Sequence, residues 1–173
     1  MTGKTHAAVG VATTAAILML NPQGFELWDM HIIPAISLVT AATGSYLPDI
    51  DIHQSTMGQR HKFISKRLKH RGFTHTLVIP ILLLALMQFI TFLLPGAILG
   101  DIINSLLFGL DLGWVLHIFA DLFNRKGVPL FYPVSKAHVH IAAVKTRHFS
   151  EYVWLGLFLI CLAGFTMYKG GYL

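Results

Sequence analysis

Residues 102–123 read IINSLLFGLDLGWVLHIFADLF, and this stretch decides the fold class of the chain. It is apolar along nearly its whole length and slightly exceeds the roughly 20 residues that a helix needs to cross the hydrocarbon core of a bilayer. The stretch therefore predicts a membrane-spanning helix. Near its end, His117 and Asp121 are four residues apart, so they share one face of that helix.

Four other apolar segments, residues 7–20, 32–47, 77–94 and 152–168, accompany this stretch. The chain has 173 residues, of which 54% are hydrophobic and only 12% are charged, and its mean hydropathy is +0.63. These values exclude an ordinary soluble domain and are typical of an integral membrane protein. The first two segments are short for a spanning helix, but their small residues suit close helix packing in lipid. We predict an all-α fold, a polytopic membrane helix bundle of about five transmembrane helices, in which residues 1–173 form a single domain.

Lysine and arginine are concentrated in two connecting segments, residues 49–76 and 124–151, whereas segments 21–31 and 95–101 contain neither. By the positive-inside rule both basic segments are cytoplasmic loops, and the N-terminus with Lys4 lies on the same side. This topology explains the net charge of +5, so we expect the lipid bilayer as a partner and no nucleic acid. The single cysteine, Cys161, can form neither a disulfide framework nor a cysteine-rich zinc site.

The residues that could bind a metal lie where the apolar segments meet the predicted cytoplasmic face. If the segments cross the membrane in alternation, seven of them come to this face: His6, Asp49, Asp51, His70, His75, His117 and Asp121. Ionisable residues in membrane segments are costly and are usually functional. Scattered structural residues would have no reason to gather at one face, whereas a metal site requires it.

Each motif also has a simpler interpretation. His117 and Asp121 can chelate one ion, bridge two ions, or form a hydrogen-bonded pair that stabilises the bundle. Asp49 and Asp51 follow the helix-ending Pro48, and on an extended backbone two carboxylates at this spacing point to the same side. They are either ligands for a metal or part of an ordinary polar turn.

The run HRGFTH at residues 70–75 places two histidines and an arginine just before the third apolar segment. The imidazoles suit zinc, manganese or iron, and the guanidinium of Arg71 presents a fork of donors that fits a phosphate. Thr74 is expected to cap the helix that follows. The alternative is a basic anchor at the membrane edge, which explains Arg71 better than it explains the histidines.

Taken together, these motifs resemble a known family. The runs LPDID at 47–51, GQRHKFISK at 58–66, HRGFTH at 70–75 and GVPL at 127–130, with the His117-x-x-Ala120-Asp121 pattern, are similar to the YdjM-like inner-membrane proteins in their order and spacing. The resemblance covers residues 6 to about 133, and Thr76 stands where serine is expected. It implies a metal-dependent hydrolase of the bacterial cytoplasmic (inner) membrane. The His/Asp set is also similar to that of zinc-dependent phospholipase C and related phosphodiesterases, which is an analogy of the site alone.

We therefore expect a metal centre at the cytoplasmic face that holds a divalent transition metal, zinc or else manganese, as two ions. The expected ligands are His6, Asp49, Asp51, His75, His117 and Asp121. A metal-activated water would hydrolyse a phosphoester or phosphodiester in a lipid-like or phosphorylated substrate. His70 is expected to act as general acid or base, and Arg71 to hold a phosphate oxygen.

Two other classes of function stay open. A metal or proton transporter would need polar residues that continue across the bilayer, and beyond Asp111 we expect few. A non-catalytic membrane protein with a structural metal would have a closed coordination shell.

Overall fold

The computed structural model describes residues 1–67 and 72–171 as a bundle of helices. Its five long helices coincide with the five apolar segments: α1 (Gly3–Leu20), α2 (Pro34–Tyr46), α5 (Val78–Leu93), α6 (Ile98–Leu122) and α7 (Phe149–Lys169). Shorter elements lie between them: β1 (Phe25–Leu27), β2 (Met30–Ile32), the 3₁₀ helices η1 (Leu47–Asp51) and η2 (Phe73–His75), and the helices α3 (Thr56–Arg60) and α4 (Lys62–Ser65).

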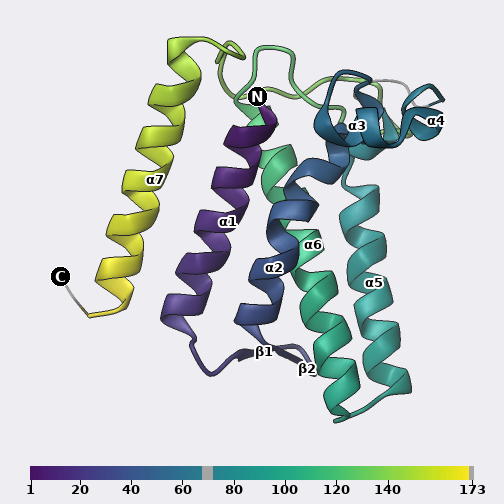
Figure 1. Cartoon of the computed structure of the whole chain (residues 1–173), viewed down its shortest axis with the longest axis vertical. Coiled ribbons are helices and arrows are strands. Elements are labelled where there is room, and N and C mark those ends of the chain that lie inside the picture. The colour runs from purple at the N-terminus through teal and green to yellow at the C-terminus, as the bar shows by residue number, and fades with distance from the viewer. Residues whose placement is uncertain (68–71, 172–173) are drawn as a thin grey trace.

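Helix α6 is the centre of the bundle, because α1, α2 and α5 all pack against it, while α7 packs against α1 (Figure 1). The N-terminus and both basic connections lie at one end of the bundle. The connection between α1 and α2, the turn between α5 and α6, and the end of α7 lie at the other end. This arrangement agrees with the predicted alternation, and it brings the start of α1 close to the end of α6.

A small antiparallel β-hairpin departs from the all-α prediction. Strand β1 pairs with β2 in the register Phe25↔Ile32, and the fully buried Met30 and Ile32 pack with Met87 of α5. The hairpin therefore closes the end of the bundle opposite the basic loops (Figure 1). Strands of three residues are too short to show the alternation of polar and apolar residues by which a strand is recognised in sequence.

Glycines allow α2 and α6 to pack backbone against backbone. A Cβ atom added at Gly44 would lie 2.2 Å from the Leu110 carbonyl oxygen, and one added at Gly113 would lie 2.2 Å from the Ala41 carbonyl oxygen. Only a residue without a Cβ atom fits at either position. Lipid tails are as apolar as the helix side chains, so the hydrophobic effect does not hold helices together within the bilayer. Close packing of small residues drives their association instead.

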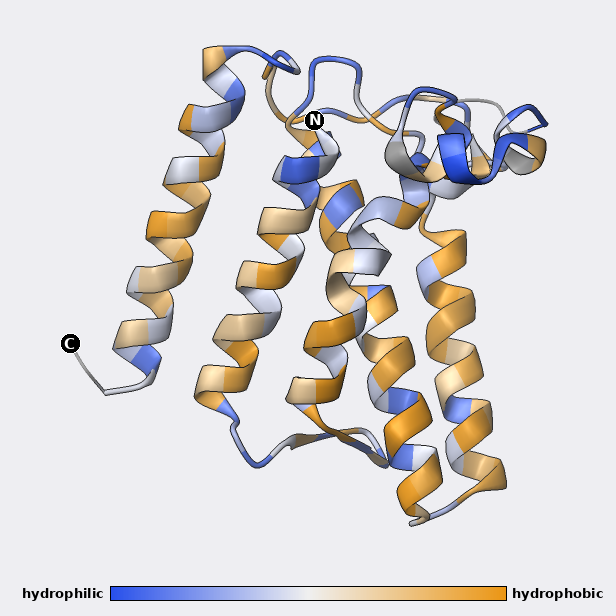
Figure 2. Ribbon diagram, viewed as in Figure 1, coloured by the Kyte–Doolittle hydropathy of each residue, from blue (hydrophilic) through white to orange (hydrophobic). Residues whose placement is uncertain are grey.

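The outer surface of the long helices is largely apolar, whereas the loops at the N-terminal end are hydrophilic (Figure 2). Helix α5 exposes a series of bulky side chains: Ile81, Leu82, Leu86, Phe89, Phe92 and Leu93. Exposed apolar surface of this extent marks contact with a membrane or with another protein. Among the described residues, α6 and α7 are long and apolar enough to cross a membrane, and α5 is apolar but shorter. The count of five crossings stays a prediction.

The cytoplasmic placement of the basic loops can be tested with topology reporters. Fusions of green fluorescent protein and alkaline phosphatase at Gln59 and Lys136 should both report the cytoplasm, because lysine and arginine are retained on that side. Fusions at Gln23 and Leu99 should report the opposite side. A cytoplasmic signal at Gln23 would contradict the alternation on which the shared face depends.

Candidate metal centre

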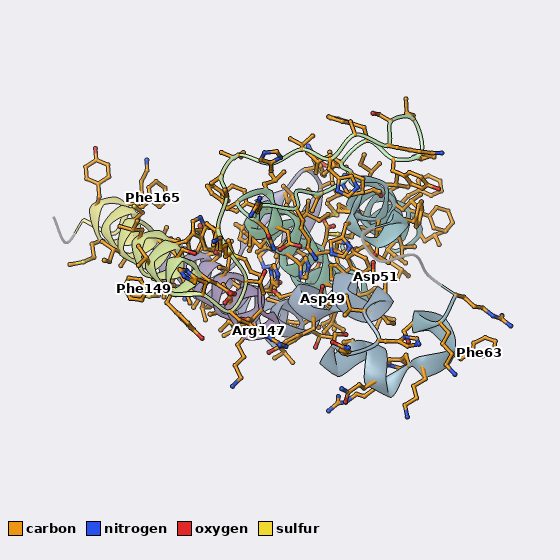
Figure 3. The ribbon with its side chains drawn as sticks, turned by 90° about the horizontal axis from the view of Figure 1, so that it is seen from above. Asp49, Asp51, Phe63, Arg147, Phe149 and Phe165 are labelled. Atoms are coloured by element: carbon orange, nitrogen blue, oxygen red, sulfur yellow. The ribbon has the colours of Figure 1, made fainter. Side chains whose placement is uncertain are left out.

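Five side chains of the kinds that bind metals meet at the end of the bundle that carries the basic loops. Helix α1 contributes His6 near its start, and α6 contributes His117 and Asp121 near its end, while η1 contributes Asp49 and η2 contributes His75. All five are buried, and the three imidazoles are fully inaccessible, at 0% exposure. Figure 3 looks onto this end of the bundle, with the aspartates of η1 labelled.

The candidate ligand atoms form two groups that share His117. One group comprises His6, His117 and Asp121, the other comprises Asp49, His75 and His117, and within each group all atoms lie within 4.8 Å of one another. Nε2 of His6 is 3.4 Å from Asp121 Oδ1, and Nε2 of His117 is 3.5 Å from Asp49 Oδ1. An N–H···O hydrogen bond is shorter, about 2.7–3.2 Å. Two atoms bound tetrahedrally to one zinc ion at about 2.1 Å are roughly 3.4 Å apart, so the separations fit a shared ion.

The backbone of α2 orients the His117 ring. Nδ1 of His117 lies 2.7 Å from the Ser45 carbonyl oxygen, which can only accept, so Nδ1 carries the proton and donates it. Nε2 of His117 therefore keeps its lone pair and faces Asp49. In metal sites, an outer hydrogen bond of this kind holds both the tautomer and the ring direction of a ligand histidine. The close packing of α2 on α6 thus determines where the lone pair of His117 points.

Asp51 lies behind His75 and outside both groups of ligand atoms. Its Oδ2 is 3.4 Å from His75 Nδ1 and accepts a hydrogen bond from Thr74 Oγ1 at 2.8 Å. The extended backbone expected for this segment is replaced by the 3₁₀ helix Leu47–Asp51, in which residues two apart point in different directions. Asp49 consequently faces Nε2 of His75, at 3.8 Å, and Asp51 faces Nδ1 of the same ring.

The η2 segment that carries His75 is anchored to α6 by Trp114. The indole Nε1 of Trp114 donates a hydrogen bond to the Thr74 carbonyl oxygen at 2.9 Å. The hydroxyl of Thr74, expected to cap α5, instead contacts Asp51 and His75 Nδ1 at 2.8 and 3.0 Å, and α5 begins after Leu77 without a side-chain cap. Thr74 and Trp114 therefore hold His75 against the end of α6.

Several ring nitrogens in the cluster are buried without a hydrogen bond. Within the described residues, both nitrogens of His6 and Nε2 of His117 have no hydrogen-bond partner. Such atoms are rare in native structures, because each costs about 1–3 kcal/mol. The two rings stack, with centroids 3.6 Å apart and 14° between their planes, which disfavours a positive charge on both. Neutral imidazoles with free lone pairs are the form in which histidine binds a metal.

The carboxylates of the cluster are suited to a neighbouring positive charge. Burial raises the pKa of Asp49 above its ordinary value, and the nearby His6 and His75 oppose this shift. Asp121 already attracts a cation, since its Oδ1 pairs with the Met1 amino group at 2.5 Å. A divalent ion between the carboxylates would supply more charge at shorter range and would stabilise both in their ionised form.

Two of the predicted site residues cannot be placed relative to this cluster. His70 and Arg71, the expected general acid or base and the expected phosphate ligand, lie outside the described residues, so their roles stay predictions. Two histidines for which the sequence predicts no role lie outside both groups of ligand atoms: His31 is on β2, and His53 Nδ1 contacts Ser65 Oγ of α4 at 2.7 Å.

Glu151 is a buried residue at this end of the bundle that the sequence analysis missed. It is 0% exposed, and its carboxylate accepts hydrogen bonds from Thr2 N, Thr5 Oγ1 and Arg147 N at 2.5, 2.6 and 2.7 Å. It thereby ties the start of α7 to the first turn of α1, next to His6. In the sequence, one acidic residue ahead of an apolar segment is typical of a helix N-terminus. The sequence therefore gives no signal that distinguishes a buried glutamate at this position from an ordinary exposed one.

Comparison with known proteins places the chain in a family. The model of the YdjM inner membrane protein family matches residues 1–172. "Inner membrane protein YdjM" of Escherichia coli (strain K12) is 41% identical over 142 residues, which is 77% of this chain and 66% of that protein, and the Shigella flexneri protein of the same name gives the same values. YvsG of Bacillus subtilis (strain 168) is 30% identical over 172 residues, 96% of this chain and 91% of that protein. No solved structure matches.

The chain spans about two thirds of the length of the E. coli and Shigella relatives, at 66%. The family match nevertheless runs from α1 to α7 and includes every residue of the metal-binding cluster. The names of these relatives agree with the apolar α6 and α7, which are able to cross a membrane. The chain belongs to the YdjM family of inner membrane proteins.

Proposed function

We propose that this protein is a metal-dependent hydrolase of phosphoesters, with its active site at the cytoplasmic end of the bundle. The observation that carries the proposal is the cluster of five buried His and Asp side chains, whose ligand atoms are separated as they would be around a shared ion. A mixture of imidazoles and carboxylates suits zinc or manganese. A cavity of about 580 Å³ reaches Asp49 and Asp121, and such access is typical of a catalytic rather than a structural metal site.

The two carboxylate oxygens of Asp121 face different histidines. Its Oδ1 faces His6 at 3.4 Å, and its Oδ2 faces His75 Nε2 at 3.9 Å. His117 has one nitrogen left after its bond to Ser45, so it can serve one ion. In this proposal Asp49, His75 and His117 would hold one ion, and His6 and Asp121 would hold a second.

The chain's own residues have separate tasks in this proposal. A bound metal would supply an activated water at neutral pH and would neutralise charge on the phosphoryl group. His117, fixed by the Ser45 carbonyl, and His75, fixed by Asp51 and Thr74, hold the ion in one position. Fixed positions of this kind lower the reorganisation needed during the reaction.

The hydrolase is tested with purified protein in phosphatidylcholine nanodiscs loaded with zinc or manganese. We expect hydrolysis of bis(p-nitrophenyl) phosphate or of a phosphomonoester, followed by p-nitrophenol absorbance or released phosphate. A chelator should stop the reaction, and His75→Ala should lose both turnover and bound metal. If the metal-loaded protein hydrolyses neither class of ester, the proposed hydrolase function is wrong.

Transport is the second candidate, and one observation favours it. Few polar residues were expected beyond Asp111, but α6 also buries Asn104 and Ser105. Nδ2 of Asn104 donates to Thr91 Oγ1 at 2.9 Å, and the Ser105 carbonyl accepts from Ser37 Oγ at 2.9 Å, so these groups bond helix to helix. Asp111 is 5% exposed, and among the described residues its Oδ1 has no hydrogen-bond partner.

Asp111→Asn separates the two candidates. This change removes a carboxylate deep in the bundle but leaves the metal cluster intact. A hydrolase should keep its turnover within about twofold, whereas a transporter that uses Asp111 should lose metal flux into liposomes containing a zinc-sensitive dye. Metal flux in the wild type that Asp111→Asn abolishes would favour transport over hydrolysis.

A further inference from the structure

The cavity beside the metal cluster is lined by residues of both charges. Its lining includes Asp49 and Asp121 of the cluster and four cationic residues: Arg125, Lys126, Lys145 and Arg147. Figure 3 looks down onto this end and shows Arg147 on the same side of the bundle as Asp49. The two segments that supply the cations are far apart in sequence and close at this cavity.

Membrane topology does not explain why these four cations surround the cavity. Segment 124–151 has five lysine or arginine residues, and only Lys136 lies outside the cavity lining. The described lysines and arginines of segment 49–76 also lie outside it, although they are at the same end of the bundle. The positive-inside rule specifies only the side of the membrane on which lysine and arginine lie, and not their positions on that side. The concentration of charge at the cavity therefore needs another cause.

Hydrogen bonds fix the backbone that carries these cations. Arg125 N donates to the Val144 carbonyl oxygen at 3.2 Å, and Asn124, which is 4% exposed, donates from Nδ2 to Thr146 Oγ1 at 3.1 Å. Residues 124–126 follow the end of α6, which holds Asp121, so the first pair of cations is placed relative to the metal cluster. The hydrogen bonds to residues 144 and 146 bring the second pair to the same cavity.

Arg147 is held in an unusual backbone conformation. Its φ is +60°, in the left-handed region that residues other than glycine rarely adopt. The buried Glu151 accepts its N–H at 2.7 Å and so stabilises this conformation. Strained residues that the surrounding structure holds in place are concentrated at binding and catalytic sites.

We propose that this cavity is the substrate's phosphate-binding site, where Arg125, Lys126, Lys145 and Arg147 hold a terminal phosphate next to Asp49 and Asp121 of the metal cluster. The inference rests on the proposed hydrolase for its chemistry and names its substrate class, a compound with an exposed, multiply charged phosphate group. Guanidinium groups bind phosphate oxygens through paired hydrogen bonds, and lysines add charge. The same phosphate can belong to a lipid headgroup at the membrane surface or to a soluble phosphoester.

Metal and phosphate should bind cooperatively at this site. The carboxylates of Asp49 and Asp121, which line the cavity, repel a phosphate unless cations lie between them and it. The bound ions remove this repulsion, and by linkage a bound phosphate must tighten the binding of the ions by the same factor. Removing the metal with a chelator should therefore weaken phosphate binding to the wild-type protein.

The test uses the full chain in phosphatidylcholine nanodiscs, loaded with manganese, and measures binding of radiolabelled inorganic phosphate by equilibrium dialysis. Arg125→Gln/Arg147→Gln should weaken phosphate binding by about tenfold or more, the scale of lost charge-assisted hydrogen bonds. The control Lys62→Gln/Lys136→Gln removes the same charge from the same end and should change it by less than about twofold. Manganese content should be equal in all three proteins. Equal losses in both double variants, or no loss in the arginine variant, would overturn the cavity assignment.

A second arm identifies the source of the phosphate. If a headgroup enters the cavity, phosphatidic acid in the nanodisc should compete with inorganic phosphate in the wild type and not in Arg125→Gln/Arg147→Gln. If the substrate is soluble, glycerol phosphate should compete and phosphatidic acid should not. Competition by either compound that persists unchanged in the arginine variant contradicts the proposal. Hydrolysis that survives in this variant would overturn the cavity assignment alone, whereas phosphate binding without hydrolysis of any ester would overturn the hydrolase alone.

Discussion

His117→Ala should abolish stable metal binding, and with it hydrolysis, while the protein still inserts and folds. His117 belongs to both groups of ligand atoms, and its Nε2 is buried with no hydrogen-bond partner among the described residues. Loss of an outer partner of a ligand typically costs 10–100-fold in metal affinity. Loss of the ligand itself should cost more than this range. Metal content of the dialysed protein, measured by inductively coupled plasma mass spectrometry, gives the result directly.

Two further variants make this test quantitative. Asp51→Asn should lower metal affinity by about 10–100-fold, because Asp51 contacts His75 Nδ1 from behind and lies outside the ligand groups. His31→Ala makes the same substitution as His117→Ala at the far end of the bundle and should leave the metal content unchanged. Full occupancy in His117→Ala would exclude this residue as a ligand, and an Asp51→Asn protein without any metal would move Asp51 into the ligand set.

Gly44→Ala should destabilise the bundle, because Gly44 is buried where the backbones of α2 and α6 meet. The new Cβ atom would lie 2.2 Å from the Leu110 carbonyl oxygen, which is backbone and cannot rotate away. Overpacking of this kind costs about 1–3 kcal/mol, and more where neither backbone can move. Separation of α2 from α6 also draws Ser45 away from His117, so metal affinity should fall together with the thermal unfolding temperature in detergent.

Gly164→Ala is the matched control on α7. A Cβ atom at Gly164 meets no atom within 4 Å, so alanine adds helix propensity without a clash. Its unfolding temperature should be unchanged or slightly higher, with a gain of up to about 1 kcal/mol. If Gly44→Ala unfolds at the same temperature as Gly164→Ala, the backbones of α2 and α6 are not in close contact at Gly44.

The five long helices could be predicted from the sequence because their signal is local. A helix in lipid must form all its backbone hydrogen bonds internally and present apolar side chains to the lipid. Residues 102–123 and the other four apolar segments are accordingly apolar over most of their length. The gathering of His6, Asp49, His75, His117 and Asp121 at one end followed from the alternation of these helices. Alternation is a property of the order of segments along the chain, so no tertiary contact was needed to infer it.

What the tertiary structure alone decided is the direction in which each group points. The hydrogen bond from His117 is accepted by the backbone carbonyl of Ser45. Every residue has such a carbonyl, so no residue type in the sequence predicts this bond. Asp51 lies behind His75 because η1 is a 3₁₀ helix, and Glu151 reaches Thr2 and Thr5 because α7 packs against α1. The cationic residues of segments 124–126 and 145–147 line one cavity because these two segments are hydrogen-bonded to each other. The sequence determines which ionisable side chains are available and at which end of the bundle they are expected. Contacts between distant segments determine which atoms face one another. The direction of each side chain depends on the packing of several helices and loops at once, so it cannot be inferred from local sequence.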